Sequence, residues 1–83
     1  SFELNQQLIG TEEVVLVEGL SKKSDQFLAG RTDSNKVVII PFDEKIRSGD
    51  YVKVKVNRAT SATLFGDFTG FTSIVEETVS LTG

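Results

Sequence analysis

The segment Tyr51–Arg58 constrains the fold most, because apolar and polar residues alternate along it. Three valines share one side of the extended chain: Val52, Val54 and Val56. A tyrosine, two lysines and an asparagine share the other side: Tyr51, Lys53, Lys55 and Asn57. Successive side chains of a strand point to opposite faces, so this period predicts a strand with a core-facing side and a wet, basic side.

Four other segments are rich in β-branched or aromatic residues and are also predicted to be strands. They cover residues 13–18, 26–32, 36–40 and 63–68. We expect Gly19 to close the first, Gly30 to permit a bulge or a close backbone approach, and Pro41 to stop the third. A chain of 83 residues forms one small domain. Short, regularly spaced strands without a convincing helix predict an all-β fold, a small five-stranded barrel of the OB-like or SH3-like kind.

The two ends of the chain have weaker patterns, so we place the domain at residues 11–68. Residues 1–10 are interpreted as a linker from an upstream domain, in which Leu4 and Leu8 allow a short amphipathic turn. Residues 69–83 are interpreted as a C-terminal tail or an extra strand, with apolar residues around Ile74 and Val79. Because the chain starts at Ser1 and has no methionine, we expect a fragment of a larger protein.

Composition limits the chemistry of this chain, since it has neither cysteine nor histidine. Disulfides, thiolate metal sites, the commonest general base and the imidazole metal ligand are therefore missing. We expect no catalysis by this chain alone. No apolar run approaches the roughly 20 residues that span a bilayer, and no signal-peptide pattern is present. The chain is accordingly expected to be soluble and cytoplasmic.

Charge is distributed unevenly, although the net charge is only −3. All nine basic residues lie between Leu20 and Thr60 together with five acids, so this window carries +4. The flanks hold the other seven acids and no base. This asymmetry suits a module that meets a phosphate backbone, with weak and salt-sensitive binding. An ordinary solvated surface would give the same distribution.

The loop 30–36 is the first candidate site, because it joins two apolar segments and carries Arg31 and Lys36 near its ends. Glycine and small polar residues allow a tight turn, and the cations favour a nucleic-acid contact. A plain polar hairpin turn is the alternative. For Arg31 the alternative is an ion pair with Asp33 or Asp25.

Two further sites carry basic side chains. Lys22 and Lys23 follow the first predicted strand and fit phosphate contacts or ordinary loop solvation. On the wet side of the alternating strand, Lys53 and Lys55 could meet phosphates while a base stacks on Tyr51. A solvated outer face of a sheet gives this second pattern as well.

Five short motifs, taken together, resemble a TRAM domain. They are VLVEG at 15–19, SKK at 21–23, LAGRT at 28–32, NKVV at 35–38 and ATLFG at 62–66. The resemblance is strongest to the C-terminal TRAM domain of the radical-SAM tRNA methylthiotransferases that modify isopentenyladenosine beside the anticodon. It covers about residues 10–68. A ribosomal-protein methylthiotransferase carries a related domain, but the GRT-x-x-N-K run favours the tRNA enzymes.

The resemblance implies a barrel that binds RNA and helps present the tRNA anticodon arm to an upstream radical-SAM domain. It implies two 4Fe-4S clusters and S-adenosylmethionine for the parent enzyme, whereas this fragment has no cysteine to hold a cluster and is expected to hold no cofactor. The leading RNA contacts would be Lys22, Lys23, Arg31, Asn35 and Lys36. Thr32 and Asn35 would offer hydrogen bonds to the ribose or to base edges, and the second tier of contacts would be Lys53, Lys55 and Arg58.

A second hypothesis belongs to a different class of function. In it the chain is a protein-interaction or structural module that packs on the catalytic domain or mediates oligomerisation. The acidic flanks and the apolar residues around Ile74 and Val79 favour this alternative.

Overall fold

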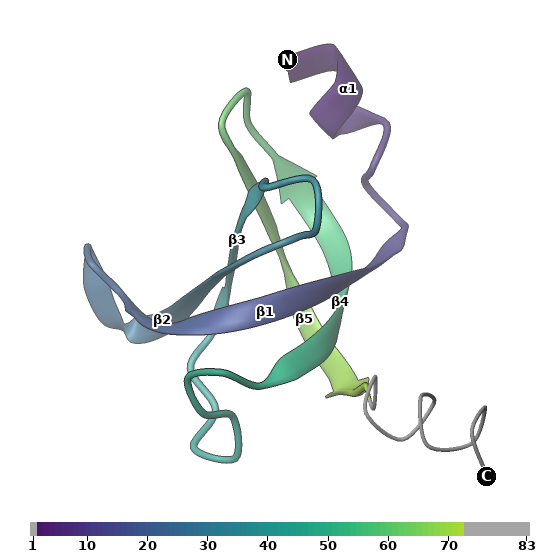
Figure 1. The fold of residues 1–83 in the computed structure, drawn as a ribbon. Helices are drawn as coiled ribbons and strands as arrows, with labels where there is room; N and C mark the ends of the chain where they lie inside the picture. The colour runs from purple at the N-terminus through teal and green to yellow at the C-terminus, as the bar shows by residue number, and fades with distance from the viewer. Residues whose placement is uncertain (1, 73–83) are drawn as a thin grey trace, which may run out of the picture.

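The computed structural model describes residues 2–72, which form one short helix and five strands (Figure 1). The elements are α1 (Phe2–Gln6), β1 (Glu12–Ser21), β2 (Ser24–Arg31), β3 (Val37–Pro41), β4 (Tyr51–Ala59) and β5 (Thr63–Phe71). The strands close into a barrel in the order β1-β2-β3-β5-β4, so that β1 lies between β2 and β4. Neighbouring strands are antiparallel except β3 and β5, which are parallel. The predicted small all-β barrel is confirmed.

The barrel interior is filled by apolar side chains from all five strands. The three valines of β4 are at most 1% exposed, as their alternation predicts: Val52, Val54 and Val56. The remaining core residues are Val15, Val17, Leu28, Val38, Ile40, Ile46, Ala59 and Leu64. Leu8 and Phe68 pack against this cluster. Removal of this apolar surface from water is the main force that stabilises the barrel.

Two strands run further than their sequence patterns predict. β1 continues through Gly19 to Ser21, because a register shift between Val17 and Gly19 lets the pairing with β2 resume. Gly19 has a φ of +148°, a backbone conformation that residues with a side chain rarely adopt. β5 continues to Phe71, which pairs with Val52 of β4. Strand β3 ends at Pro41 as predicted. The pattern around Ile74 and Val79 lies outside the described residues.

Gly30 has the close backbone contact that the sequence suggested. A Cβ atom at this position would lie 2.5 Å from the carbonyl oxygen of Leu16 and 2.7 Å from a methyl group of Val15. Gly30 pairs regularly with Val17 and Val38, so the bulge lies in β1 and not at Gly30. This close approach places Arg31, the next residue, directly opposite Leu16.

The N-terminal segment, interpreted above as a linker, contains the helix α1, which lies beside the β4–β5 turn in Figure 1. The Asn5 amide donates to the carbonyl of Thr60 at 2.8 Å, and the Gln6 amide donates to the carbonyl of Ala59 at 2.7 Å. Asn5 is only 3% exposed. A five-residue helix is not stable alone, so these contacts with the barrel stabilise it.

Candidate nucleic-acid interface

The β2–β3 turn, residues 32–36, is organised by Thr32. The Thr32 hydroxyl accepts a hydrogen bond from the Lys36 backbone amide at 3.2 Å and is bonded to the Ser34 hydroxyl at 3.1 Å. The Asn35 amide donates to the Thr32 carbonyl at 2.9 Å, and Asn35 adopts a φ of +67°. Thr32 is only 7% exposed. Its hydroxyl, predicted to contact ribose or a base, therefore bonds within the turn.

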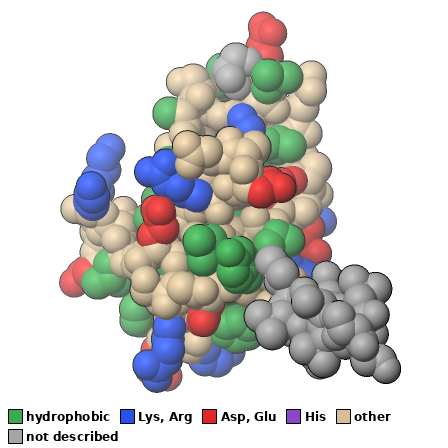
Figure 2. Space-filling view, in the orientation of Figure 1, with side chains coloured by type: hydrophobic (Ala, Val, Ile, Leu, Met, Phe, Trp, Pro, Cys, Tyr) green, Lys and Arg blue, Asp and Glu red, His purple; other side chains and the backbone are tan. Residues whose placement is uncertain are grey.

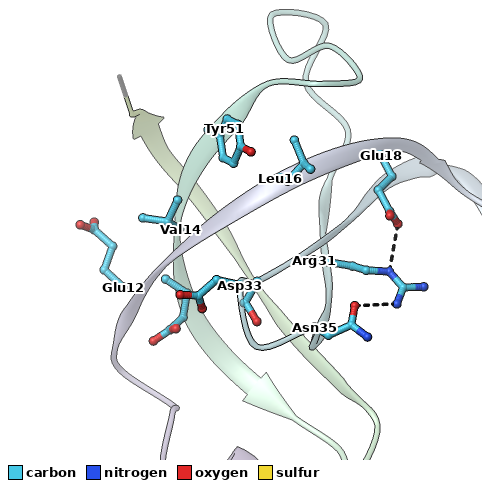
Figure 3. Close-up of a pocket in the computed structure, with 10 residues that line it drawn as sticks. Glu12, Val14, Leu16, Glu18, Arg31, Asp33, Asn35 and Tyr51 are labelled. Carbon is cyan, nitrogen blue, oxygen red and sulfur yellow. Dashed lines mark hydrogen bonds and ion pairs between the residues drawn. The ribbon is translucent and has the colours of Figure 1, made fainter. Parts of the chain in front are cut away.

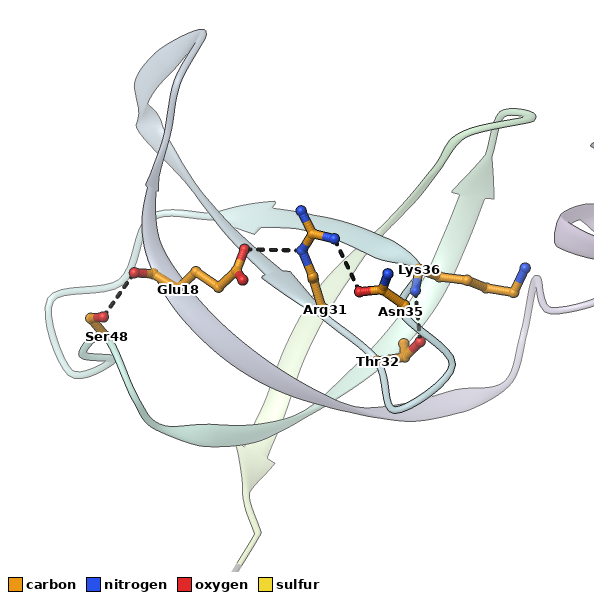
Figure 4. A network of polar contacts seen from close by, with 6 residues as sticks. All are labelled: Glu18, Arg31, Thr32, Asn35, Lys36 and Ser48. Atoms are coloured by element: carbon orange, nitrogen blue, oxygen red, sulfur yellow. Dashed lines mark hydrogen bonds and ion pairs between the residues drawn. The ribbon is translucent and has the colours of Figure 1, made fainter.

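Arg31 lies in a small polar network on the barrel surface (Figure 4). Its Nε donates to the Glu18 carboxylate at 3.4 Å, and its Nη1 donates to the Asn35 side-chain oxygen at 3.0 Å. The ion-pair partner is thus Glu18 of β1 and neither Asp33 nor Asp25. The sequence could not indicate this partner, because the pairing of β1 with β2 brings residues 13 positions apart together. Both side chains are about half exposed, so the pair contributes about 0–1 kcal/mol.

Lys36 points away from this network (Figure 4). Its ammonium donates to the Asn5 side-chain oxygen at 2.7 Å, and Asn5 is the buried residue of α1. Lys36 itself is half-buried. The Lys36 ammonium is therefore not part of the network of Arg31 and Asn35. It links the β2–β3 turn to α1 instead.

Lys22 and Lys23 form the tip of the β1–β2 hairpin, which projects from the barrel in Figure 1. Both are exposed, and neither is in an ion pair with another described residue. The Lys23 backbone amide donates to the Ser21 hydroxyl at 3.4 Å, and this bond leaves the lysine side chain unengaged. These two lysines are therefore accessible to an anionic partner.

The second tier of cations lies on the outer face of β4. Lys55 is opposite Glu12 of β1 on one side and Asp67 of β5 on the other. Lys53 is opposite Val14 and Gly70. The Arg58 guanidinium lies 3.8 Å from the centre of the Phe65 ring, a cation–π contact. Lys53 is thus the cation of this group that has no carboxylate or ring as its direct neighbour across the sheet.

The predicted site residues do not form one basic patch. Figure 2 shows Lys and Arg side chains in separate groups on this face, with Asp and Glu side chains close to them. The structure brings Arg31, Thr32 and Asn35 together at the β2–β3 turn. It places Lys22 and Lys23 at the hairpin tip, Lys36 beside α1, and the other three cations on β4.

A groove lies along β1, and the sequence analysis did not predict it (Figure 3). Its lining includes four carboxylates, three apolar side chains and Arg31. The strand predicted over residues 13–18 has one buried face, at Val15 and Val17, and leaves Val14 and Leu16 exposed on the other. The signal was present in Glu12 and Glu18, which lie at alternate positions with Val14 and Leu16 and therefore on the same face of β1.

A closed barrel of five short strands, with its polar groups at strand connections and on outer strand faces, defines the class of small β-barrel domains. The family model described as "TRAM domain" matches residues 6–69. This chain belongs to the TRAM domain family, as its motifs predicted.

The curated relatives are tRNA-2-methylthio-N(6)-dimethylallyladenosine synthases. Those of Parabacteroides distasonis and Bacteroides thetaiotaomicron are each 52% identical over 68 residues, which cover 81% of this chain and 14% of the relative. The one from Karelsulcia muelleri is 43% identical over 67 residues, covering 81% of this chain and 15% of the relative. The predicted similarity to tRNA methylthiotransferases is confirmed. The chain spans about one seventh of the length of these relatives.

Residues 2–72 contain neither a candidate metal site nor a helix that could span a membrane. Within residues 2–72, no three His, Cys, Asp or Glu side chains are grouped so that they could hold a metal ion. The whole chain has no cysteine, so its residues do not fit an iron–sulfur cluster. Over the same residues, no helix has the length and apolar character needed to cross a membrane.

Proposed function

We propose that this chain is the RNA-binding accessory domain of a tRNA methylthiotransferase. It would help bind the tRNA anticodon arm while an upstream radical-SAM domain 2-methylthiolates isopentenyladenosine. The observation that carries the proposal is the TRAM family match over residues 6–69, with relatives named as synthases of a modified tRNA base. In this proposal the parent works in the cytoplasm, and its two 4Fe-4S clusters and S-adenosylmethionine belong to the catalytic domain.

The hairpin lysines are the strongest phosphate contacts in this proposal. Lys22 and Lys23 are exposed at a projecting tip, and moving them onto phosphates breaks no ion pair among the described residues. Release of counterions from RNA would supply the favourable free energy of such contacts. Lys53 adds a third accessible cation on β4, and Lys55 and Arg58 lie on the same strand.

Arg31 and Asn35 would contribute beside the turn. Arg31 uses Nε and Nη1 for Glu18 and Asn35, which leaves Nη2 to bond RNA. A phosphate would compete with the Glu18 carboxylate, and an exposed ion pair of this kind is easily exchanged. Lys36 and Thr32 rank below them, since both already bond within the domain.

The test is a titration of the 83-residue chain with a fluorescent anticodon stem-loop RNA at low salt. We expect Lys22→Ala/Lys23→Ala to weaken binding about fivefold or more, because two phosphate contacts are lost. Arg31→Ala should weaken it less, since that side chain must first leave Glu18.

Lys45→Ala/Arg47→Ala is the matched control, because it removes the same charge from the exposed β3–β4 connection. We expect it to leave the affinity within about twofold of the original chain. Unchanged affinity of the hairpin variant, or an equal loss in the control, would refute the proposed contact site. No measurable binding of the original chain to the RNA would refute the RNA-binding function itself.

A further inference from the structure

The groove on β1 has an apolar floor that no part of the described chain covers. Its volume is about 620 Å³, within the range of about 300–1,000 Å³ that ligand sites occupy. The floor is formed by Val14, Leu16 and Tyr51, which are 44%, 36% and 42% exposed. Leu16 and Tyr51 are direct partners across β1 and β4, so the three side chains are contiguous. Contiguous exposed apolar side chains mark interaction surfaces.

The two ends of the groove differ in charge (Figure 3). At one end the Glu18 carboxylate is paired with Arg31, which also binds Asn35. The other end holds three carboxylates without an ion pair among the described residues: Glu12, Glu13 and Asp33. Glu12 accepts a hydrogen bond from the Thr69 hydroxyl at 2.9 Å, and Glu13 accepts one from the Thr11 hydroxyl at 2.8 Å. Neutral hydroxyl groups orient these carboxylates but do not compensate their charge.

The lysines of the neighbouring strand reduce this negative charge only in part. Lys53 and Lys55 are opposite Val14 and Glu12 across the β1–β4 pairing, but neither lines the groove. Lys55 also faces Asp67 on its other side. The groove lining itself has four carboxylates and one guanidinium. Such a site repels phosphate groups and attracts cationic ones.

The backbone beside the groove also has an open edge. β1 pairs with β4 from Glu12 to Leu16, but its pairing with β2 starts only at Leu16. Over residues 12–15, β1 therefore has a strand neighbour on one side only. The open side faces the β2–β3 turn across the groove, since the lining includes residues of both. An open strand edge offers backbone hydrogen bonds to an extended chain.

We propose that this groove docks an extended protein segment that carries lysine or arginine at one end and apolar residues at the other. The basic side chains would meet Glu12, Glu13 and Asp33, and the apolar ones would cover Leu16 and Tyr51. The partner is a protein and not RNA, so this function is additional to the proposed RNA binding. The groove and the proposed RNA-binding surface meet at Arg31, which lines the groove and is also one of the proposed RNA contacts.

The probe is a five-residue peptide with lysines at one end and valine and leucine at the other, titrated into the ¹⁵N-labelled 83-residue chain. We expect the largest amide shift changes at residues 12–16 and 32–35. A peptide with serine in place of the apolar residues should bind about fivefold more weakly or worse, because it cannot cover the floor. A peptide with glutamate in place of lysine should not bind.

Glu12→Gln/Asp33→Asn tests the acidic end, because it removes two charges while keeping the shapes of the side chains. We expect it to weaken the lysine peptide about fivefold or more and to leave anticodon RNA binding unweakened. Asp25→Asn/Glu44→Gln is the matched control, since both acids are exposed and neither lines the groove. It should leave peptide binding within about twofold.

Three results would overturn this proposal. They are shift changes spread over the whole surface, an equal loss of peptide binding in the control variant, and equal binding of the serine peptide. If the anticodon RNA instead of the peptide moves the amides of residues 12–16, the groove belongs to RNA. The proposed RNA-binding function is tested separately by the hairpin lysines, so the two proposals can fail independently.

Discussion

At Gly30 the backbone of β1 lies so close to β2 that a side chain would not fit, and the missing side chain of glycine makes this approach possible. A Cβ atom there would meet the Leu16 carbonyl and the Val15 side chain, and both belong to the packed wall of the barrel. Neither neighbour is the free end of a flexible side chain, so the strands would have to move apart. Gly30 thereby determines where Arg31 and the β2–β3 turn lie.

We predict that Gly30→Ala destabilises the barrel by about 1–3 kcal/mol, because overpacking forces the two strands apart. Urea unfolding followed by circular dichroism would measure the change. Gly70→Ala is the control, since a Cβ atom at Gly70 would have no other atom within 4 Å. Equal stability of the Gly30 and Gly70 variants would contradict the predicted contact.

Thr32 is a second single residue that stabilises the fold, because its hydroxyl holds the β2–β3 turn together. We predict that Thr32→Val, which keeps the shape of the side chain, lowers the free energy of unfolding by about 1–3 kcal/mol because the Lys36 amide loses its acceptor in a buried position. Thr63→Val is the control, because the Thr63 hydroxyl makes no hydrogen bond within residues 2–72, and it should change the stability by less than about 0.5 kcal/mol. Thermal unfolding of both variants checks the prediction, and a Thr32→Val chain as stable as the original would refute it.

At the scale of elements, α1 depends on two connections of the barrel. Asn5 donates to Thr60 in the β4–β5 turn and accepts from Lys36 at the end of the β2–β3 turn. Both turns lie at the same end of the barrel as α1, and the β3–β4 connection with Ile46 lies at the other (Figure 1). A cation that the sequence assigned to RNA therefore stabilises the position of a helix.

We predict that Asn5→Ala lowers the free energy of unfolding by about 1–3 kcal/mol, because the Thr60 carbonyl and the Lys36 ammonium both lose their hydrogen-bond partner. In a double-mutant cycle, Asn5→Ala and Lys36→Met should show a coupling of about 0.5–1.5 kcal/mol. The exposed Gln7→Ala serves as a control and should change little. Purely additive effects of the Asn5 and Lys36 substitutions would argue against this bond.

At the scale of the whole molecule, one pair of unpaired lysines and one group of unpaired carboxylates lie apart on the described part of the barrel. Lys22 and Lys23 are at the hairpin tip, whereas Glu12, Glu13 and Asp33 gather at one end of the β1 groove. In the two proposals above, a domain with net charge −3 would contact RNA through one region and attract basic protein segments through another.

We predict a shallow salt dependence for the RNA complex, because few phosphates are contacted. Each contact to a single-stranded segment contributes about 0.7 to the slope of log K against log salt, so Lys22→Ala/Lys23→Ala should reduce the slope by about 1.4. Titrations from 50 to 200 mM salt would measure it. An unchanged slope would show that these lysines do not neutralise phosphates.

Much of the fold could be predicted because the strands have local signals. The valine alternation in β4 and the β-branched run of β3 each indicate a strand without knowledge of the rest of the chain. Strand ends were less predictable. β1 continues beyond Gly19 because a bulge between Val17 and Gly19 restores its pairing with β2, and β5 continues to Phe71 because it pairs with β4. Pairing across the sheet decides such ends, and a single segment does not contain that information.

The sequence alone determined that five strands form, which valines face the core, and that the chain carries TRAM motifs, because these depend on side-chain period and order along the chain. Only the tertiary structure decided what each cation contacts. It paired Arg31 with Glu18, gave Lys36 to Asn5 and left Lys22 and Lys23 exposed. The physical reason is that a charged side chain takes its partner from whichever strand or turn the closed barrel places beside it.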